Sequence, residues 1–277
     1  MKRILAILCA LAMAALLFAG CGGTDTPTEP PTTSFENQPA ELQLIVPGTL
    51  TVGTEIGYPP FEQFADDGTT PIGLDIELAT KLAEMLGVAV AFQNTDFEGI
   101  LDGLGTDKYD VVMSAVTITA ARKEKVDFSS DYIENWQSIV VRKGAEPVDS
   151  PEGMNGKTVA LQKATTSTEF LDKLTSTGAI TCTDRPYEKV MDCFNDLKLG
   201  RADLVLCDSV VAEAYVEREP DEFEISWHES TVEGAEPELF GIGVKKGNAD
   251  LLDAINAALA ELEASGWMDD LRQRWLA

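Results

Sequence analysis

From about residue 50 to its end, short apolar runs typical of strands alternate with stretches in which apolar residues have the spacing of an amphipathic helix. Short, mostly apolar runs predict strands at residues 50–53, 88–92, 111–116, 158–161, 180–182, 203–207 and 238–245. Amphipathic stretches predict helices at residues 75–86, 167–176, 187–199, 209–216 and 251–262, and a last helix with Trp267, Leu271 and Trp275. A capping box at residues 95–98 predicts a helix with Ile100, Leu101 and Leu104 inward, and Thr119 predicts the cap of a short helix.

The alternation of strands and helices predicts an α/β protein with a mostly parallel sheet covered on both faces. The pattern restarts near Thr158, so we expect two successive α/β lobes. Ligands of such sheets bind at the carboxyl ends of strands, which places the expected site between the lobes.

The first twenty residues have the layout of a secretory signal peptide. Lys2 and Arg3 precede an uncharged run of 16 residues, which is short for a membrane span of about 20. Residues 21–46 are rich in Pro and Thr, a composition that cannot build a core and predicts a tether. No later stretch reaches 18 apolar residues.

The charge is strongly acidic, with 47 acidic and 21 basic residues among 277 and a net charge of −26. Removal of the signal peptide would leave 19 basic residues and a charge of −28. This excess argues against binding to nucleic acid or to an anionic membrane surface, since both need a basic face.

Three cysteines remain after Cys9 and Cys21, namely Cys182, Cys193 and Cys207. They are either three small buried hydrophobic residues or include a Cys182–Cys193 disulfide, because an exported protein can oxidise. Their spacing matches no zinc site, and we expect neither a metal nor a cofactor. The single histidine, His228, has no nucleophile motif near it and is interpreted as structural.

Six segments in order carry a resemblance to a known family: residues 54–61 (TEIGYPPF), 73–78 (GLDIEL), 117–122 (TITAAR), 126–129 (VDFS), 156–159 (GKTV) and 200–203 (GRAD), the last leading to Asp208. With them the chain resembles the family 3 extracellular solute-binding proteins, which are amino-acid receptors of ABC importers. The resemblance covers residues 47–277 and implies the type II periplasmic-binding-protein fold, two α/β lobes joined by two crossing strands. It places lobe one at residues 47–136 plus 237–277 and lobe two at 137–236, with crossings near residues 135–138 and 231–237.

The end of the signal peptide, Leu-Phe-Ala-Gly-Cys at residues 17–21, resembles the lipobox of bacterial lipoproteins. The resemblance implies that Cys21 is lipidated and becomes the new N-terminus; Phe18 departs from the usual Leu. The implied location is extracytoplasmic, on the outer face of the bacterial cytoplasmic membrane or in the periplasm. Ordinary secretion and an uncleaved anchor helix are the alternatives.

A site for a free amino acid needs a cation and an anion a few ångströms apart, because an unpaired buried charge is costly. Arg122 is the candidate cation, since residues 47–136 hold only five basic residues against sixteen acidic ones and guanidinium offers a fork to a carboxylate. The resemblance assigns it to the ligand α-carboxylate; a surface ion pair is the alternative. Asp208 ends a predicted strand and matches the family residue for the α-ammonium, or it caps the next helix.

The resemblance implies further ligand contacts. Thr165 is expected to hold the carboxylate, with Thr166 as the alternative because Lys163 or Ala164 stands where the family has Gly. Aromatic rings are expected around the ligand side chain, with core packing as the alternative. Glu55 is expected either to bind a cationic or amide group of the ligand side chain or to be solvated. Trp136 is expected either to line the pocket or to pack beside it. The remaining expected contacts are Ser114, Ala115 and Thr117, and the two rings are Tyr58 and Phe97.

The sequence thus predicts a receptor, not an enzyme, that closes its lobes on a polar α-amino acid and delivers it to the transmembrane subunits of an ABC permease. A secreted dehydratase-like enzyme of the same fold, with Glu55 as its acid or base, is one alternative. An amino-acid sensor lipoprotein is another. Cystine or a basic amino acid is the next choice of ligand after a polar one.

Overall fold

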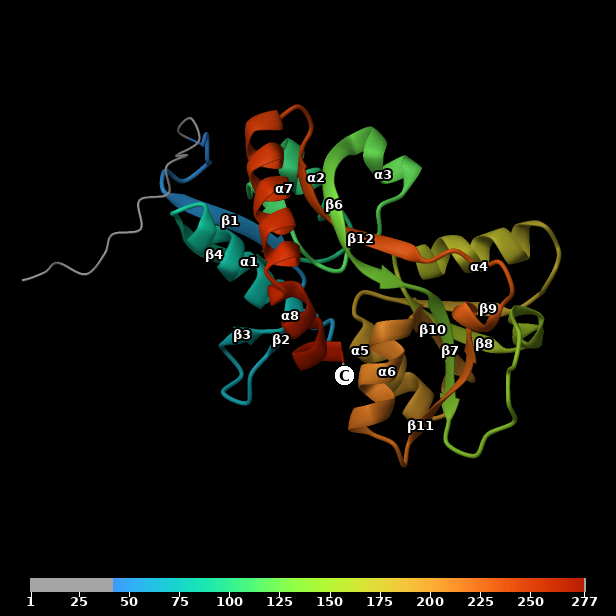
Figure 1. Ribbon diagram of the computed structural model, residues 1–277. Helices are drawn as coiled ribbons and strands as arrows, with labels where there is room; N and C mark the ends of the chain where they lie inside the picture. Colours follow the sequence, from blue (N-terminus) through green and yellow to red (C-terminus); the bar gives the residue numbers. More distant parts are fainter. Residues whose placement is uncertain (1–41, 277) are drawn as a thin grey trace, which may run out of the picture. The chain divides into compact units, whose positions relative to one another are not determined.

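The computed structural model describes residues 42–276 (Figure 1). The predicted signal peptide and Cys21 lie outside these residues. Two five-stranded sheets organise the described part of the chain. The first has the order β4-β1-β5-β12-β6 and consists of β1 (Thr49–Thr54), β4 (Ala89–Asn94), β5 (Val111–Val112), β6 (Val126–Asn135) and β12 (Glu238–Lys245). The second has the order β11-β7-β10-β8-β9 and consists of β7 (Gln137–Arg142), β8 (Thr158–Gln162), β9 (Thr183–Tyr187), β10 (Leu204–Asp208) and β11 (Phe223–His228).

Each sheet is mixed, so the prediction of mostly parallel sheets is wrong. In the first sheet β1 is parallel to β4 and β5, whereas β12 is antiparallel to β5 and β6. In the second sheet β8 is parallel to β9 and β10, whereas β7 is antiparallel to β10 and β11. The antiparallel strands are those by which the chain leaves one sheet and enters the other. Trp136 alone separates β6 from β7, and residues 229–237 separate β11 from β12. The predicted bounds of the lobes stay a prediction.

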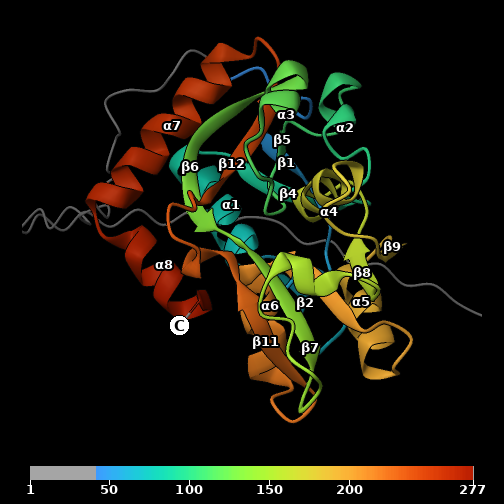
Figure 2. The same cartoon turned by 90° about the vertical axis from the view of Figure 1, so that its right-hand side faces the viewer.

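The helices lie against both sheets (Figures 1 and 2). Those beside the first sheet are α1 (Leu74–Met85), α2 (Asp102–Gly105), α3 (Ala120–Lys125), α7 (Ala249–Ala264) and α8 (Trp267–Leu276). Those beside the second are α4 (Thr166–Ser176), α5 (Val190–Lys198) and α6 (Ser209–Arg218). The remaining elements are the hairpin of β2 (Gln63–Phe64) and β3 (Pro71–Ile72), and the short 3-10 helices Pro151–Met154 and Glu229–Thr231. Over residues 42–276, no helix is both long and apolar enough to span a membrane.

Side chains on the strands of the second sheet alternate between two hydrophobic clusters, because successive residues of a strand point to opposite faces. Ile139 and Val141 of β7 pack in the cluster that includes Leu171 of α4. Val140, between them, packs in the cluster that includes Phe194 of α5 and Tyr215 of α6. Both faces of this sheet are therefore buried, which explains the apolar runs in its sequence.

Three predicted elements differ from the observed ones. The capping box at residues 95–98 does not start a helix: Thr95 donates to Thr54 and extends the strand ladder, and Gly99 has a positive φ of 81°. The predicted strand 111–116 shortens to β5, since the positive φ of Ala115 turns the chain away. The strand expected at 180–182 lies instead at β9, residues 183–187. Tyr187, which was predicted to begin a helix, is therefore the last residue of this strand.

The three cysteines are free, so the alternative of a Cys182–Cys193 disulfide is wrong. Cys193 and Cys207 are buried and Cys182 is half-buried, as expected of small hydrophobic residues.

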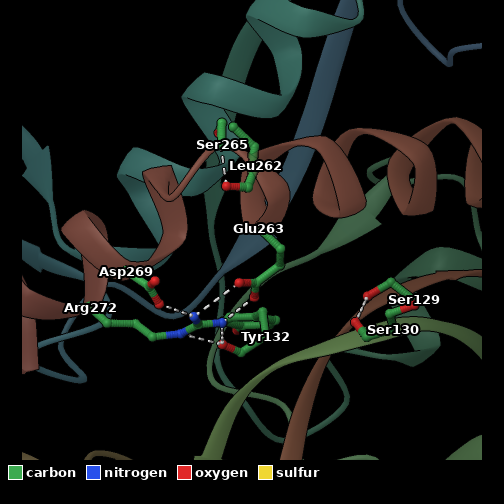
Figure 3. Close-up of polar contacts among 8 residues, drawn as sticks. All are labelled: Ser129, Ser130, Tyr132, Leu262, Glu263, Ser265, Asp269 and Arg272. Atoms are coloured by element: carbon green, nitrogen blue, oxygen red, sulfur yellow. Dashed lines mark hydrogen bonds and ion pairs between the residues drawn. The ribbon is translucent and has the colours of Figure 1, made fainter.

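The last helix is tied to β6 by hydrogen bonds (Figure 3). Arg272 of α8 donates through Nε and Nη2 to the carbonyl of Tyr132, at 3.2 and 2.9 Å, and pairs with Glu263 and Asp269. The Tyr132 hydroxyl in turn donates to Asp75 of α1 at 3.0 Å. The carboxyl-terminal helix therefore fixes a strand and a helix that both lead to the site.

Gly73 fixes the start of α1 against the turn at residues 58–61. Its φ of 138° is a conformation that side chains rarely adopt, and a Cβ there would lie 2.1 Å from the Phe61 carbonyl oxygen. The close approach lets Leu74 and Asp75 donate their N–H groups to the carbonyls of Pro60 and Phe61.

We predict that Gly73→Ala lowers the free energy of unfolding by more than about 2 kcal/mol, from backbone strain and the clash. Gly87→Ala is the control, because Gly87 also has a positive φ, 71°, but nothing within 4 Å of its Cβ position. It should cost about 1 kcal/mol. Urea denaturation measures both, and equal losses would show that the Phe61 contact carries no cost.

Candidate functional site

A small, partly enclosed hollow collects most of the residues expected to bind a ligand. Seven of the nine line it, together with Gln162 and Thr166: Tyr58, Phe97, Ala115, Thr117, Arg122, Thr165 and Asp208. Glu55 and Ser114 do not line it. The hollow lies beyond the carboxyl ends of β5, β8 and β10, where ligand sites of α/β sheets are found.

Arg122 is a buried cation, 9% exposed, on the short helix α3. The predicted cap is present: the Thr119 hydroxyl accepts from the Arg122 N–H at 3.2 Å. The guanidinium donates to the carbonyls of Thr117 and Ala164, at 2.9 and 3.1 Å, and lies 5.5 Å from the ring centroid of Phe97. Burial lowers the pKa of Arg122 from its ordinary value. Within residues 42–276 no carboxylate lies within 4 Å of it, so the predicted alternative of a protein ion pair is wrong.

Asp208 is a buried carboxylate at the end of β10. It stands at the N-cap position, directly before α6, but makes no side-chain capping bond, so the capping alternative is wrong. Its oxygens accept from the Tyr58 hydroxyl, from Asn135 Nδ2 at 2.8 Å and from Gln137 Nε2 at 3.1 Å. Burial raises the pKa of Asp208, while these three donors oppose the rise.

Glu238 lies beside Asp208 and was not anticipated from the sequence. Asn135 and Gln137 each donate to Glu238 Oε2 as well, at 3.2 and 3.0 Å, and Thr166 donates to it at 3.0 Å. Burial and the neighbouring Asp208 raise the pKa of Glu238 to about 7. Two carboxylates thus share neutral amide donors, and among the described residues neither has a cation within 4 Å.

Ser114 and Ala115 each donate a hydrogen bond to a buried acid, Glu62 and Asp75 respectively. Ser114 Oγ donates to Glu62 at 2.6 Å, and the Ala115 N–H donates to Asp75 at 2.8 Å, so neither group is free for a ligand here. Glu62 Oε2 and Asp75 Oδ1 are buried and lack a hydrogen-bond partner among the described residues. Burial raises the pKa of Asp75 to about 7 and, together with the charge of Asp75, raises that of Glu62 well above its ordinary value.

Both threonines considered for the carboxylate contact line the hollow, at the N-terminal end of α4. Thr165 donates its hydroxyl to the Gln162 carbonyl at 2.8 Å. The Thr166 hydroxyl lies 3.5 Å from that of Thr117, across the hollow. Thr165 and Thr166 therefore both stand where they could contact a ligand carboxylate.

The two predicted aromatic residues take different roles. Phe97 lies under the Arg122 guanidinium. Tyr58 stacks on Phe61 with ring centroids 6.5 Å apart, and its hydroxyl donates a hydrogen bond to Asp208. Trp136 does not line the hollow; its ring lies 6.2 Å from that of His228. His228 accepts from the Ser230 N–H at 3.2 Å, a local structural contact.

Glu55 is buried but is neither solvated nor in the hollow. Its carboxylate accepts from Gln162 Nε2 at 2.6 Å and lies 2.8 Å from Lys189 Nζ. Burial raises the pKa of Glu55, and Lys189 opposes the rise. In residues 42–276, no three His, Cys, Asp or Glu side chains are grouped as metal ligands.

Gln137, Gln162 and Glu238 are the main residues that the sequence did not identify. Each lies at an end of a strand that faces the site: Gln137 begins β7, Gln162 ends β8 and Glu238 begins β12. The predicted strands at residues 158–161 and 238–245 placed Gln162 and Glu238 at strand ends, but no strand was predicted to begin at Gln137. Their convergence depends on the pairing of distant strands, which no local pattern reveals.

Comparison with known proteins identifies the group to which these features correspond. A family model described as "Bacterial extracellular solute-binding proteins, family 3" matches residues 50–277. The L-cystine-binding protein TcyJ of Escherichia coli strain K12 is 34% identical over 229 residues, which are 82% of this chain and 82% of TcyJ.

Solved structures are similar as well, and two of them illustrate the likeness. An ancestral arginine-binding protein bound to arginine has a TM-score of 0.77 and 38% identity, over 83% of this chain and 99% of that one. The ancestral amino acid-binding protein AncCDT-1, a precursor of cyclohexadienyl dehydratase, has a TM-score of 0.74 and 35% identity, over 83% and 96%. These likenesses support the predicted type II periplasmic-binding-protein fold.

We predict that stability falls as pH rises through the titration of Asp75. Its pKa is raised in the folded state, so the folded protein holds a proton that the unfolded chain loses above about pH 4. The loss of stability continues until about pH 7. Asp75→Asn should flatten the fall in melting temperature between pH 5 and 8, whereas Asp66→Asn, at an exposed acid, should not. A melting temperature that rises over this range in the wild type would contradict the account.

Proposed function

Because the chain belongs to family 3 of the bacterial extracellular solute-binding proteins, we propose that it binds a free, polar α-amino acid as the receptor of an ABC importer. One observation carries the proposal. Arg122 is buried with no carboxylate within 4 Å among residues 42–276, and Asp208, in the same hollow, likewise has no cation within 4 Å. A buried charge without a counterion costs several kcal/mol, and a zwitterionic ligand supplies both counterions.

In this proposal Arg122 binds the ligand α-carboxylate through a bidentate pair. Thr165 and Thr166 stand beside it at the N-terminus of α4, where the helix dipole favours an anion. The α-ammonium binds Asp208, and Glu238 adds a second negative charge nearby. Phe97 and Tyr58 contact the ligand side chain.

Closure of the two lobes, residues 47–136 plus 237–277 and residues 137–236, would bring these groups together. Tyr58 reaches Asp208, and Arg122 reaches the Ala164 carbonyl, so each contact joins one predicted lobe to the other. Only contacts that exist in the closed state favour closure, and a ligand bridging Arg122 and Asp208 adds such contacts. The connections at Trp136 and residues 229–237 would act as the hinge.

We propose that residues 1–20 direct export, that Cys21 carries a lipid, and that residues 21–46 tether the receptor beside the permease subunits. This would hold the protein outside the cytoplasm, at the outer face of the bacterial cytoplasmic membrane.

A dehydratase of the same fold is the second candidate, because one structural neighbour is a precursor of cyclohexadienyl dehydratase. The acid that it would use, Glu55, is held by Gln162 and Lys189 outside the hollow. We therefore propose binding without turnover. Product formation from prephenate or arogenate would contradict this.

We predict that Arg122→Ala weakens binding of the amino-acid ligand at least about 100-fold, since the ligand carboxylate would lose its only buried cation partner. Calorimetry with the twenty amino acids and cystine identifies the ligand and measures the loss. Lys123→Ala, one residue away and exposed, is the matched control and should change affinity less than twofold. Failure of every amino acid to bind, or equal binding by the Arg122 variant, would refute the function.

The affinity should also rise from pH 5 to pH 8. An ammonium group favours the charged form of Glu238, so below its pKa of about 7 binding must first remove a proton. Glu238→Gln should weaken binding about tenfold at pH 8 and reduce the pH dependence. Titrations at four pH values measure both effects, and a variant with the full wild-type pH dependence would exclude Glu238 as the cause.

A further inference from the structure

Four polar side chains meet at a second place between the carboxyl ends of parallel strands. Glu55 follows β1 and Asp96 follows the adjacent parallel strand β4 in the first sheet. Gln162 ends β8 and Lys189 follows the adjacent parallel strand β9 in the second sheet. The cluster therefore draws equally on both sheets.

The contacts of this cluster are specific. Lys189 Nζ lies 2.8 Å from Glu55 Oε1 and 3.3 Å from Asp96 Oδ1. Gln162 Nε2 donates to Glu55 Oε2 at 2.6 Å and to the Glu188 carbonyl at 2.9 Å. Side-chain exposure rises from 2% for Glu55 through 29% for Lys189 to 71% for Asp96. Glu55 is thus a buried anion with one close, partly buried cation, and Asp96 is solvated.

Gln162 connects this ion pair to the hollow that holds Arg122. Gln162 lines the hollow with Arg122 and Asp208, and it also donates to Glu55. Its Oε1 atom is buried and has no hydrogen-bond partner among the described residues, so an acceptor is available beside the hollow. A ligand side chain that displaces this amide would reach Glu55 and Lys189 directly.

The charges of the pair decide which side chain fits. A side chain that ends in a bare cation would meet Lys189 as a like charge, and a bare carboxylate would meet Glu55 in the same way. A group that carries both signs would pair with both residues and leave no buried charge unpaired. Because Glu55 and Lys189 come from different sheets, opening of the cleft would separate them and expose both for such a group.

We propose that Glu55 and Lys189 form a second charged subsite, and that the ligand is an α-amino acid whose side chain ends in a second amino–carboxylate pair. This inference rests on the proposed function. Arg122 and Asp208 bind one zwitterionic head, and Lys189 and Glu55 bind the carboxylate and ammonium of the other. Lys189 is then the residue that disfavours cationic side chains.

The test compares L-cystine and L-cystathionine, which carry two such heads, with L-arginine, which ends in a bare cation. The wild-type protein should bind both two-headed ligands at least tenfold more tightly than L-arginine, by calorimetry. Lys189→Met should weaken cystine binding at least tenfold and strengthen arginine binding, which reverses the preference. Glu55→Gln should weaken binding of all three.

Lys163→Met is the matched control, because Lys163 is a partly exposed lysine near the same strand ends and pairs with Glu188, not with Glu55. It should leave the preference unchanged, and melting temperatures should show that every variant is folded. Preference of the wild type for arginine, or an unchanged preference in Lys189→Met, would overturn the second subsite while amino-acid binding stands. Absence of binding by any amino acid would instead refute the proposed function.

Discussion

Arg122 and Asp208, which line the hollow, and Glu238, which lies beside Asp208, are charges that neutral groups hold in place. Carbonyl oxygens orient the guanidinium, and the amides of Asn135 and Gln137 orient both carboxylates. Such an arrangement is costly without a ligand, because buried charges need counterions. We interpret that cost as the source of specificity: a free amino acid carries the two missing counterions on one carbon, whereas most other solutes carry at most one.

The fold serves this arrangement by bringing strand ends together from distant parts of the chain. Asn135 ends the strand that leaves the first sheet, Gln137 begins the one that enters the second, and Glu238 begins the strand that returns. The residues that hold the two carboxylates therefore stand at the connections between the sheets. A change in the angle between lobes would move these donors relative to Asp208, so ligand binding and closure are coupled through the same few hydrogen bonds.

The sequence predicted the local parts of this account and missed those that depend on tertiary contacts. Arg122 and Asp208 were found because each stands at a strand–helix junction within a motif, and Thr119 was identified correctly as the cap of α3. The helix expected after Thr95 failed because Gly99 and the strand ladder override a local capping pattern. Glu238 and Lys189 escaped notice because their importance comes from partners about 30 and 130 residues away, at Asp208 and Glu55.

A crystal structure of the protein with its amino-acid ligand would test the pairing of Arg122 and Asp208 with the ligand most directly. We expect the ligand α-carboxylate to accept two hydrogen bonds from Arg122 and the ammonium to lie within hydrogen-bond distance of Asp208. A ligand whose carboxylate is bound elsewhere, or an Arg122 that pairs with a protein carboxylate in the complex, would contradict this pairing.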